Sequence, residues 1–145
     1  MIAVEREIQA PADAVWRVLA DGWLYATWVV GASRMRSVDA NWPAEGSELR
    51  HSQGAWPLLI NDITRVLRSE PGRELMLLGK VRPVGEVQVR LLLTPRPEGC
   101  HVRMEEDAVA GPMRLLPRPL RLALIYPRNV ESLRRLSYIA EGESR

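Results

Sequence analysis

The order of the hydrophobic patterns constrains the fold of this chain more than any other feature. Residues 2–9 alternate apolar and polar side chains with the period of two that is typical of a half-buried strand. Helical patterns follow at 11–22, where Pro11 suits a first helical turn, and at 23–29. The helical period then disappears until the C-terminal segment. We expect this order to give a sheet curled around one long helix, with a cavity between them.

Six strand-like runs fill the middle of the chain, at 33–39, 47–52, 59–69, 73–81, 86–94 and 100–108. Turn residues, mainly proline and glycine, separate them. The connections are too short for parallel crossovers, which need roughly a dozen residues or more, so they predict antiparallel hairpins. Alternation is clearest in the fifth of these runs, where one face carries Val87, Val89, Leu91 and Leu93.

The C-terminal helical pattern has one apolar stripe, formed by Val130, Leu133, Leu136 and Ala140. Pro127 precedes this stripe, and a proline inside a helix removes a backbone donor and clashes with the preceding turn. We therefore expect a kink or a new helix start near Asn129. The stripe is expected to face the inward row of the sheet, which contains Val87, Val89, Leu91, Val102 and Met104.

Length and composition fit a single domain covering residues 1–145. The only cysteine, Cys100, excludes an intramolecular disulfide and favours a reducing compartment. No signal-peptide pattern is present, and the apolar runs are too short to span a bilayer. We expect a cytoplasmic protein without integral membrane association, and the sequence leaves its oligomeric state open.

The charge pattern does not favour nucleic-acid binding. The formal net charge is only +2, although the sequence pI is near 9.1. A nucleic-acid binder gathers basic residues on one face or helix. Here arginines are spread along the chain, apart from a mild cluster from Arg114 to Arg135. We therefore expect no nucleic-acid partner.

The first helical segment also carries a family resemblance. The stretch Gln-Ala-Pro-Ala-Asp-Ala-Val-Trp-Arg-Val-Leu-Ala-Asp at 9–21 resembles the opening of the START/Bet v 1-like (SRPBCC) superfamily, in particular its polyketide cyclase/dehydrase and lipid-transport branch. The similarity continues in Trp-Pro-Ala-Glu-Gly at 42–46, Pro-Gly-Arg-Glu-Leu at 71–75 and Arg-Asn-Val-Glu-Ser-Leu-Arg-Arg-Leu at 128–136. These motifs specify a fold better than they specify a reaction.

The resemblance implies an α+β helix-grip fold. In that fold a seven-stranded antiparallel sheet curls around the long C-terminal helix, and two short helices follow the first strand. Members bind sterols, lipids, polyketides or other apolar molecules between sheet and helix, and some catalyse cyclisation or dehydration there. Fold-level analogy supports a ligand cavity more strongly than a reaction.

The residues expected to line this cavity are mainly apolar: Val89, Leu91, Met104, Leu133 and Leu136, with Trp28 near the mouth. A large aromatic side chain serves cores as well as pockets, so Trp28 has a second interpretation as part of the helix-to-sheet contact. A lining of Val, Leu and Met favours an apolar or aromatic ligand with one or two polar groups at most.

Glu106 and His51 are the candidate catalytic residues. Glu106 shares the parity of Val102 and Met104, so an inward apolar row would carry its carboxylate into the cavity. Burial would raise the pKa of Glu106 unless Arg90 or another cation pairs with it. The alternative is that Glu106 lies in a solvated acidic run. For His51 the alternative is a hydrogen-bonded strand histidine, because a base is usually recognised with a paired acid.

Other chemical templates are absent from the sequence. There is no phosphate-cradling glycine loop and no cysteine or histidine pair with metal-ligand spacing, so we expect neither a cofactor nor a metal. Cys100 has no neighbouring base that would activate it.

Three functions remain. The first is binding of an apolar or aromatic small molecule, lipid-like or polyketide-like, in the cavity. The second is a polyketide cyclase or dehydratase, with Glu106 or His51 as acid or base and Arg90 or Arg65 stabilising an enolate. The third is a protein-interaction module. Convergent buried titratable groups would favour the enzyme, a dry cavity would favour transport or sensing, and a filled cavity with an exposed apolar patch would favour the module.

Overall fold

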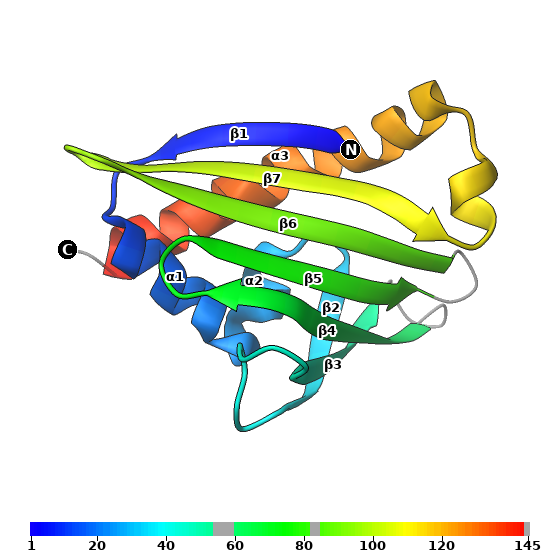
Figure 1. Cartoon of the computed structure of the whole chain (residues 1–145), viewed down its shortest axis with the longest axis horizontal. Helices are drawn as coiled ribbons and strands as arrows, with labels where there is room; N and C mark the ends of the chain where they lie inside the picture. The colour runs from blue at the N-terminus through cyan, green and yellow to red at the C-terminus, as the bar shows by residue number, and fades with distance from the viewer. Residues whose placement is uncertain (54–59, 82–84, 144–145) are drawn as a thin grey trace.

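A computed structural model describes residues 1–53, 60–81 and 85–143. These residues form seven strands: β1 (Ile2–Ile8), β2 (Ala32–Val38), β3 (Glu48–Gln53), β4 (Ile60–Glu70), β5 (Glu74–Val81), β6 (Gly85–Arg96) and β7 (Gly99–Ala110). They form one antiparallel sheet in the order β1-β7-β6-β5-β4-β3-β2 (Figure 1). Residue 59, the expected first residue of the fourth strand, lies outside the described residues.

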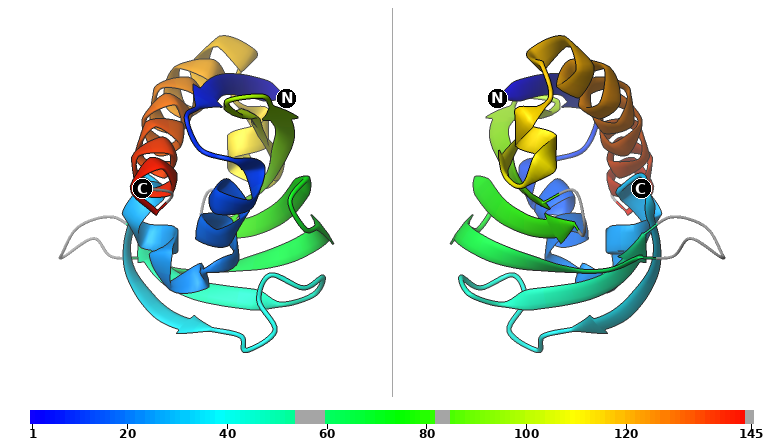
Figure 2. Two further views of the ribbon diagram at one scale, coloured as in Figure 1. Left: turned by 90° about the vertical axis from the view of Figure 1, so that its left-hand side faces the viewer. Right: turned by 90° about the vertical axis from the view of Figure 1, so that its right-hand side faces the viewer.

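The helices occupy both ends of the sequence, as its patterns predict. After β1 come α1 (Ala12–Ala20), the 3-10 turn η1 (Gly22–Leu24) and α2 (Tyr25–Trp28). After β7 come the 3-10 turn η2 (Pro112–Leu115) and the long α3 (Arg118–Glu143). The sheet is strongly curved, and α3 crosses its open side with α1 and α2 beside it (Figure 2). The predicted α+β helix-grip arrangement is confirmed.

The inner face of the sheet is built from rows that cross several strands. Leu91 of β6 pairs with Leu75 of β5 and with Met104 of β7, and all three side chains are buried. Two residues further along each strand, Val89 pairs with Glu106. The expected inward parity is therefore correct: Val102 and Met104 are buried, and Val87 and Val89 are half-buried.

The main core lies where α1 and the second half of α3 meet the sheet. Leu133, Leu136 and Ala140 of α3 are fully buried, and they join Val15 and Val18 of α1 in one cluster. Spacing of three and four residues places these α3 side chains on one face of the helix. The predicted apolar stripe therefore forms the contact with the sheet, except that Val130 is 39% exposed.

Pro127 does not restart the helix. The sequence predicts either a kink or a new helix start near Asn129, and the second alternative is wrong, because α3 runs from Arg118 to Glu143 as one helix with Pro127 inside it. Pro127 lies on the exposed side of the helix, as does Ala123, the residue whose carbonyl loses its helical hydrogen bond to the proline. Water can take the place of the missing donor there, so the helix continues.

Candidate functional site

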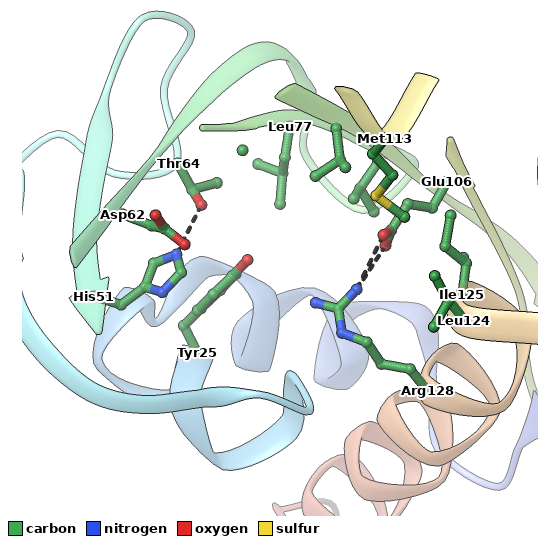
Figure 3. Close-up of a pocket in the computed structure, with 13 residues that line it drawn as sticks. Tyr25, His51, Asp62, Thr64, Leu77, Glu106, Met113, Leu124, Ile125 and Arg128 are labelled. Atoms are coloured by element: carbon green, nitrogen blue, oxygen red, sulfur yellow. Dashed lines mark hydrogen bonds and ion pairs between the residues drawn. The ribbon is translucent and has the colours of Figure 1, made fainter. Parts of the chain in front are cut away.

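A pocket of about 210 Å³ lies between α3, α2 and the inner face of the sheet (Figure 3). It occupies the end of the sheet-to-helix interface away from the α1 core. Its walls combine apolar and polar side chains from eight elements. The lining residues are Tyr25, His51, Asp62, Thr64, Leu77, Gly79, Val87, Val89, Glu106, Met113, Leu124, Ile125 and Arg128.

The floor of the pocket is apolar, and one glycine opens it. Along the inner face of β5, the residues in sequence are Leu75, Leu77 and Gly79, so the row of leucines ends where the pocket begins. A Cβ atom added at Gly79 would lie 3.3 Å from Cγ2 of Val87 and 3.9 Å from Oγ1 of Thr64. Any larger side chain at this position would project into the pocket.

Glu106 and Arg128 form one polar wall. The Nη1 of Arg128 donates to both carboxylate oxygens of Glu106, at 3.0 and 3.3 Å, and the side-chain amide of Asn129 donates to the same carboxylate at 3.3 Å. The Nε of Arg128 donates to the backbone carbonyl of Val30 at 2.8 Å, which holds the guanidinium in place. Figure 3 shows the guanidinium reaching across the pocket toward Glu106.

The carboxyl of Glu106 is only 2% exposed. Burial raises the pKa of Glu106, because the charged form loses its hydration. The positive charge of Arg128 and the hydrogen bonds from Arg128 and Asn129 oppose that rise but do not cancel it. The site therefore holds a carboxyl that binds its proton more tightly than an exposed glutamate does.

The opposite wall is formed by His51, Asp62, Thr64 and Tyr25. His51 and Thr64 lie on neighbouring strands, with Nε2 of the imidazole 3.1 Å from the threonine hydroxyl. The ring of Tyr25 lies against that of His51, with centroids 5.1 Å apart. The hydroxyl of Tyr25 points into the space between the two walls (Figure 3).

Burial determines the charge state of this wall. His51 is 2% exposed, and burial lowers the pKa of its imidazole to about 4, with the positive charges of Arg36 and Arg128 acting in the same direction. Burial also raises the pKa of the Tyr25 hydroxyl. At neutral pH, His51 is therefore an uncharged imidazole and Tyr25 a protonated phenol, and each can exchange hydrogen bonds with a ligand.

The described residues contain no group of three or more histidine, cysteine, aspartate or glutamate side chains placed to hold a metal ion. The polar side chains of the two walls are hydrogen-bond donors, acceptors and titratable groups. What this arrangement can do is orient a small molecule over an apolar floor and exchange protons with it.

A model of the family described as polyketide cyclase/dehydrase and lipid transport matches residues 1–136. The chain belongs to this family. A search of curated protein sequences finds no match.

Solved structures with the same fold include proteins of several kinds. Protein MLL2253 from Mesorhizobium loti is 24% identical, with a TM-score of 0.71 and coverage of 97% of this chain and 96% of that one. The di-domain aromatase/cyclase StfQ of the steffimycin biosynthetic pathway is 12% identical, with a TM-score of 0.74, and the match covers 97% of this chain and 51% of StfQ. Ara h 8.0201 is 8% identical, with a TM-score of 0.71 over 97% of this chain and 96% of its own. At these identities the similarity shows the fold alone.

Three of the residues singled out in the sequence meet at the pocket of this family member. Glu106, His51 and Val89 all line it, and the first two lie on opposite walls. The sequence suggests Glu106 because of its parity with Met104, and the cation that pairs with it is Arg128.

The other predicted lining residues lie in the packed core. Four of them are at most 2% exposed and belong to one buried cluster, and none of the four lines the pocket: Leu91, Met104, Leu133 and Leu136. Trp28 is also 2% exposed, and its ring packs edge-on against Tyr25 at 5.7 Å. In place of Trp28, it is Tyr25 that faces the pocket.

Arg90 and Arg65 lie on the outer face of the sheet. Arg90 forms an ion pair with Glu74 at 2.9 Å, and Arg65 pairs with Glu48 at 2.8 Å. Both have the parity opposite to that of the inner rows, which points their side chains away from the pocket. The guanidinium that faces the pocket comes from the helix instead.

Sequence reasoning missed Arg128, Tyr25, Asp62 and Thr64. A signal for Arg128 exists: the α3 stripe, extended back from Leu133 in steps of four, reaches Asn129 and Ile125, and Arg128 lies between them on this side of the helix. On β4, Thr64 and Asp62 share the parity of buried Val66. No comparable signal marks Tyr25, whose helix is a single turn.

Proposed function

We propose that the protein binds a small aromatic molecule with oxygen substituents in the pocket between the sheet and α3. One observation carries this proposal: an apolar floor lies between two polar walls whose groups are buried or half-buried and face the same space. Binding sites for small molecules combine these features, with a mainly apolar lining and a few polar groups that fix orientation. Membership of the polyketide cyclase/dehydrase and lipid transport family supports it.

The size and polarity of the pocket narrow the ligand. An engineered apolar cavity of roughly 150 Å³ accepts benzene, so a pocket of about 210 Å³ suits one ring or two fused rings better than a sterol. The sequence alone predicts at most one or two polar groups on the ligand. Six of the 13 lining side chains are polar or charged, which favours a ligand with hydroxyl or carbonyl groups at both ends.

The two walls offer different partners to those oxygens. Arg128 is a pure donor and suits a carbonyl or a phenolate oxygen. Neutral His51 and the Tyr25 hydroxyl can each donate or accept, depending on tautomer and rotation, and suit a hydroxyl group. A hydroxylated aromatic ketone satisfies both walls while its rings cover the floor formed by Leu77, Gly79 and Val87.

A second candidate is a cyclase or dehydratase that acts on such a molecule. The observation that favours it is the convergence of the buried titratable groups Glu106, His51 and Asp62 on one pocket. In a dehydration, neutral His51 would accept the proton on the carbon next to a ketone, while Arg128 stabilises the developing enolate oxygen. The protonated form of Glu106 would then donate its proton as the carbon–oxygen bond breaks and water leaves.

Calorimetric titration with 1-naphthol and hydroxy-acetonaphthone tests the binding proposal. We expect both naphthalene compounds to bind the wild-type protein saturably, and we expect no binding of cholesterol. Gly79→Val fills the pocket floor and should abolish binding, whereas Gly142→Ala, with no atom within 4 Å of the added Cβ, is the matched control and should leave it unchanged. Equal affinity in the wild type and Gly79→Val would reject this pocket as the binding site.

The catalytic candidate needs its own substrate. 3-Hydroxy-1-tetralone loses one water to give 1-naphthol, a change that can be followed by absorbance. We expect enzyme-dependent conversion that falls by on the order of 10²-fold or more in both His51→Gln and Glu106→Gln, in line with the contribution of general acid–base groups. Tight binding without conversion would leave the protein as a binder and reject the second candidate.

A further inference from the structure

The N-terminal half of α3 presents an apolar surface to solvent. Every exposed residue from 119 to 130 is apolar, and we call this surface the apolar ridge. Leu120 and Leu124 are 53% and 58% exposed, and Tyr126 is 47% exposed. In Figure 1 this stretch is the orange part of α3 that rises beyond β1.

The second half of α3 carries charged residues on its exposed side, as surface helices usually do. After residue 130, the exposed positions include Arg134 and Arg135, which form ion pairs with Glu131. A helix on the surface of a globular protein normally carries charged or polar residues on its outer side. A continuous exposed apolar patch marks a surface that meets something other than water.

The charge around the ridge is of one sign. Residues 111–130 contain four arginines and no acidic residue, so the remaining residues hold 16 basic and 18 acidic side chains, a net charge of −2. Arg121 pairs with Asp107 at 3.0 Å, and Arg128 belongs to the pocket. Arg114 and Arg118 are exposed and form no ion pair within the part of the chain that the structure describes. The ridge and its flank therefore favour an anionic partner.

The shape of the ridge decides which anionic partner fits best. The ridge is the outer side of a helix, with one shallow apolar hollow between Pro119, Leu122, Ala123, Tyr126 and Pro127. It carries no charged or amide side chain that would fix the orientation of a protein partner. A second copy of the chain would bring two positive segments together, which is unfavourable. A lipid surface requires neither a groove nor directed hydrogen bonds: leucine and tyrosine enter the headgroup boundary while arginines meet the phosphates.

We propose that the apolar ridge docks on an anionic lipid surface. Leu124 belongs to both the ridge and the pocket lining, so docking would bring the pocket beside the bilayer. Among the described residues no helix has the length and apolar character needed to cross a membrane, so the contact is peripheral. This inference does not depend on the identity of the pocket ligand.

Vesicle cosedimentation tests the proposal with the whole chain. The probes are phosphatidylcholine vesicles with and without roughly one third phosphatidylglycerol. We expect binding to the anionic vesicles only, lost in high salt because the arginine contacts are screened. Arg114→Gln with Arg118→Gln should weaken binding about 30-fold, since each arginine near an anionic surface contributes roughly a factor of five. Leu120→Ser with Tyr126→Ser should weaken it on the order of tenfold or more.

Matched controls separate the ridge from general surface properties. Trp23 is 58% exposed on η1, and Arg17 and Arg73 are exposed elsewhere. Trp23→Ser and Arg17→Gln with Arg73→Gln should bind vesicles like the wild type. Gly79→Val should also bind like the wild type, which separates this inference from the proposed pocket.

Three results would overturn the proposal. Absence of binding to anionic vesicles is the first, and equal binding by the ridge variants and the wild type is the second. The third is a dimer in light scattering that Leu120→Ser converts to a monomer, because a second copy would then cover the ridge. A monomer that binds only anionic vesicles through the ridge supports it.

Discussion

The two ends of the interface between the sheet and α3 use the same strands in opposite ways. At one end, Leu75 of β5, Leu91 of β6 and Met104 of β7 are buried in one core cluster with Leu133 of α3. At the other end, two to four residues further along those strands, the inner face changes to half-buried Val87, to Gly79 and to buried Glu106. Packing density at the first end stabilises the fold, and the second end gives up packing for space and polarity.

This contrast has an energetic consequence. A buried aliphatic side chain contributes about 1.5–3 kcal/mol through the surface it removes from water. A buried carboxyl contributes little or nothing, because its desolvation offsets its ion pair. We therefore expect the packed end to dominate thermal stability and the open end to dominate the dependence of stability on pH.

The largest effect should come from the packed end. Leu133→Ala should lower the free energy of unfolding by about 3–5 kcal/mol, because Leu133 is fully buried and the change leaves a cavity. Leu77→Ala, which truncates a buried residue that also lines the pocket, should cost less, since the pocket already lies on one side of its side chain. Urea unfolding of both variants measures the difference. A larger loss for Leu77→Ala would contradict the assignment of the two ends.

The next effect is the acid response of His51. Its pKa in the folded state is about 4, below the value of 6.5 expected when unfolded, so the neutral imidazole stabilises the fold above pH 6.5 and this stability is lost as the pH falls through 4. The full difference corresponds to about 3 kcal/mol. Unfolding of His51→Gln, compared with wild type from pH 8 to 3.5, should show a shallower loss in acid. Parallel curves would mean that His51 is solvated.

Arg128 should have a somewhat smaller effect at neutral pH. Arg128→Met leaves the carboxylate of Glu106 buried without its cation, which should cost about 2–3 kcal/mol given that the Arg128 side chain is 31% exposed. The double variant Glu106→Gln with Arg128→Met should recover most of this loss. Denaturant unfolding at pH 7.5 measures all three proteins, and equal losses in the single and double variants would show that the ion pair does not matter.

The smallest effect should be the contribution of Glu106 to the pH dependence of stability, which has the opposite sign to that of His51. Because burial raises its pKa above the unfolded value of 4.5, Glu106 contributes stability below pH 4.5 that is lost as the pH rises through the higher folded value. Relative to Glu106→Gln, the wild type should therefore become less stable as the pH increases. A difference between the two that does not change with pH would show that the pKa is not raised.

The sequence predicts well which face of a strand or helix points into the core. The parity of Val102, Met104 and Glu106 places all three on the inner face, and the spacing of Leu133 and Leu136 places both on the sheet side of α3. These rules depend only on the period of a strand or a helix, and so they hold without knowledge of the partner element.

The sequence does not predict how far along each strand the packing extends. Leu91 and Val89 have the same parity, but the first is fully buried in the core cluster while the second borders the pocket. Whether an inward residue is core or lining depends on where the helix crosses the sheet. The same limit applies to Trp28, for which the sequence allows both the cavity mouth and the helix-to-sheet contact, and which lies in the core. It also explains why the sequence does not identify Arg128 as a pocket residue, since its partner Glu106 is 22 residues away in the sequence.

The two ends can be compared directly by nuclear magnetic resonance of methyl groups during a titration with 1-naphthol. If the open end is a ligand site, the methyl signals of Leu77, Val87, Val89 and Ile125 should shift and saturate together. Those of Leu91, Leu133 and Leu136 should remain in place. Shifts centred on the packed end, or no saturable shifts at either end with any hydroxylated bicyclic ligand, would contradict the account.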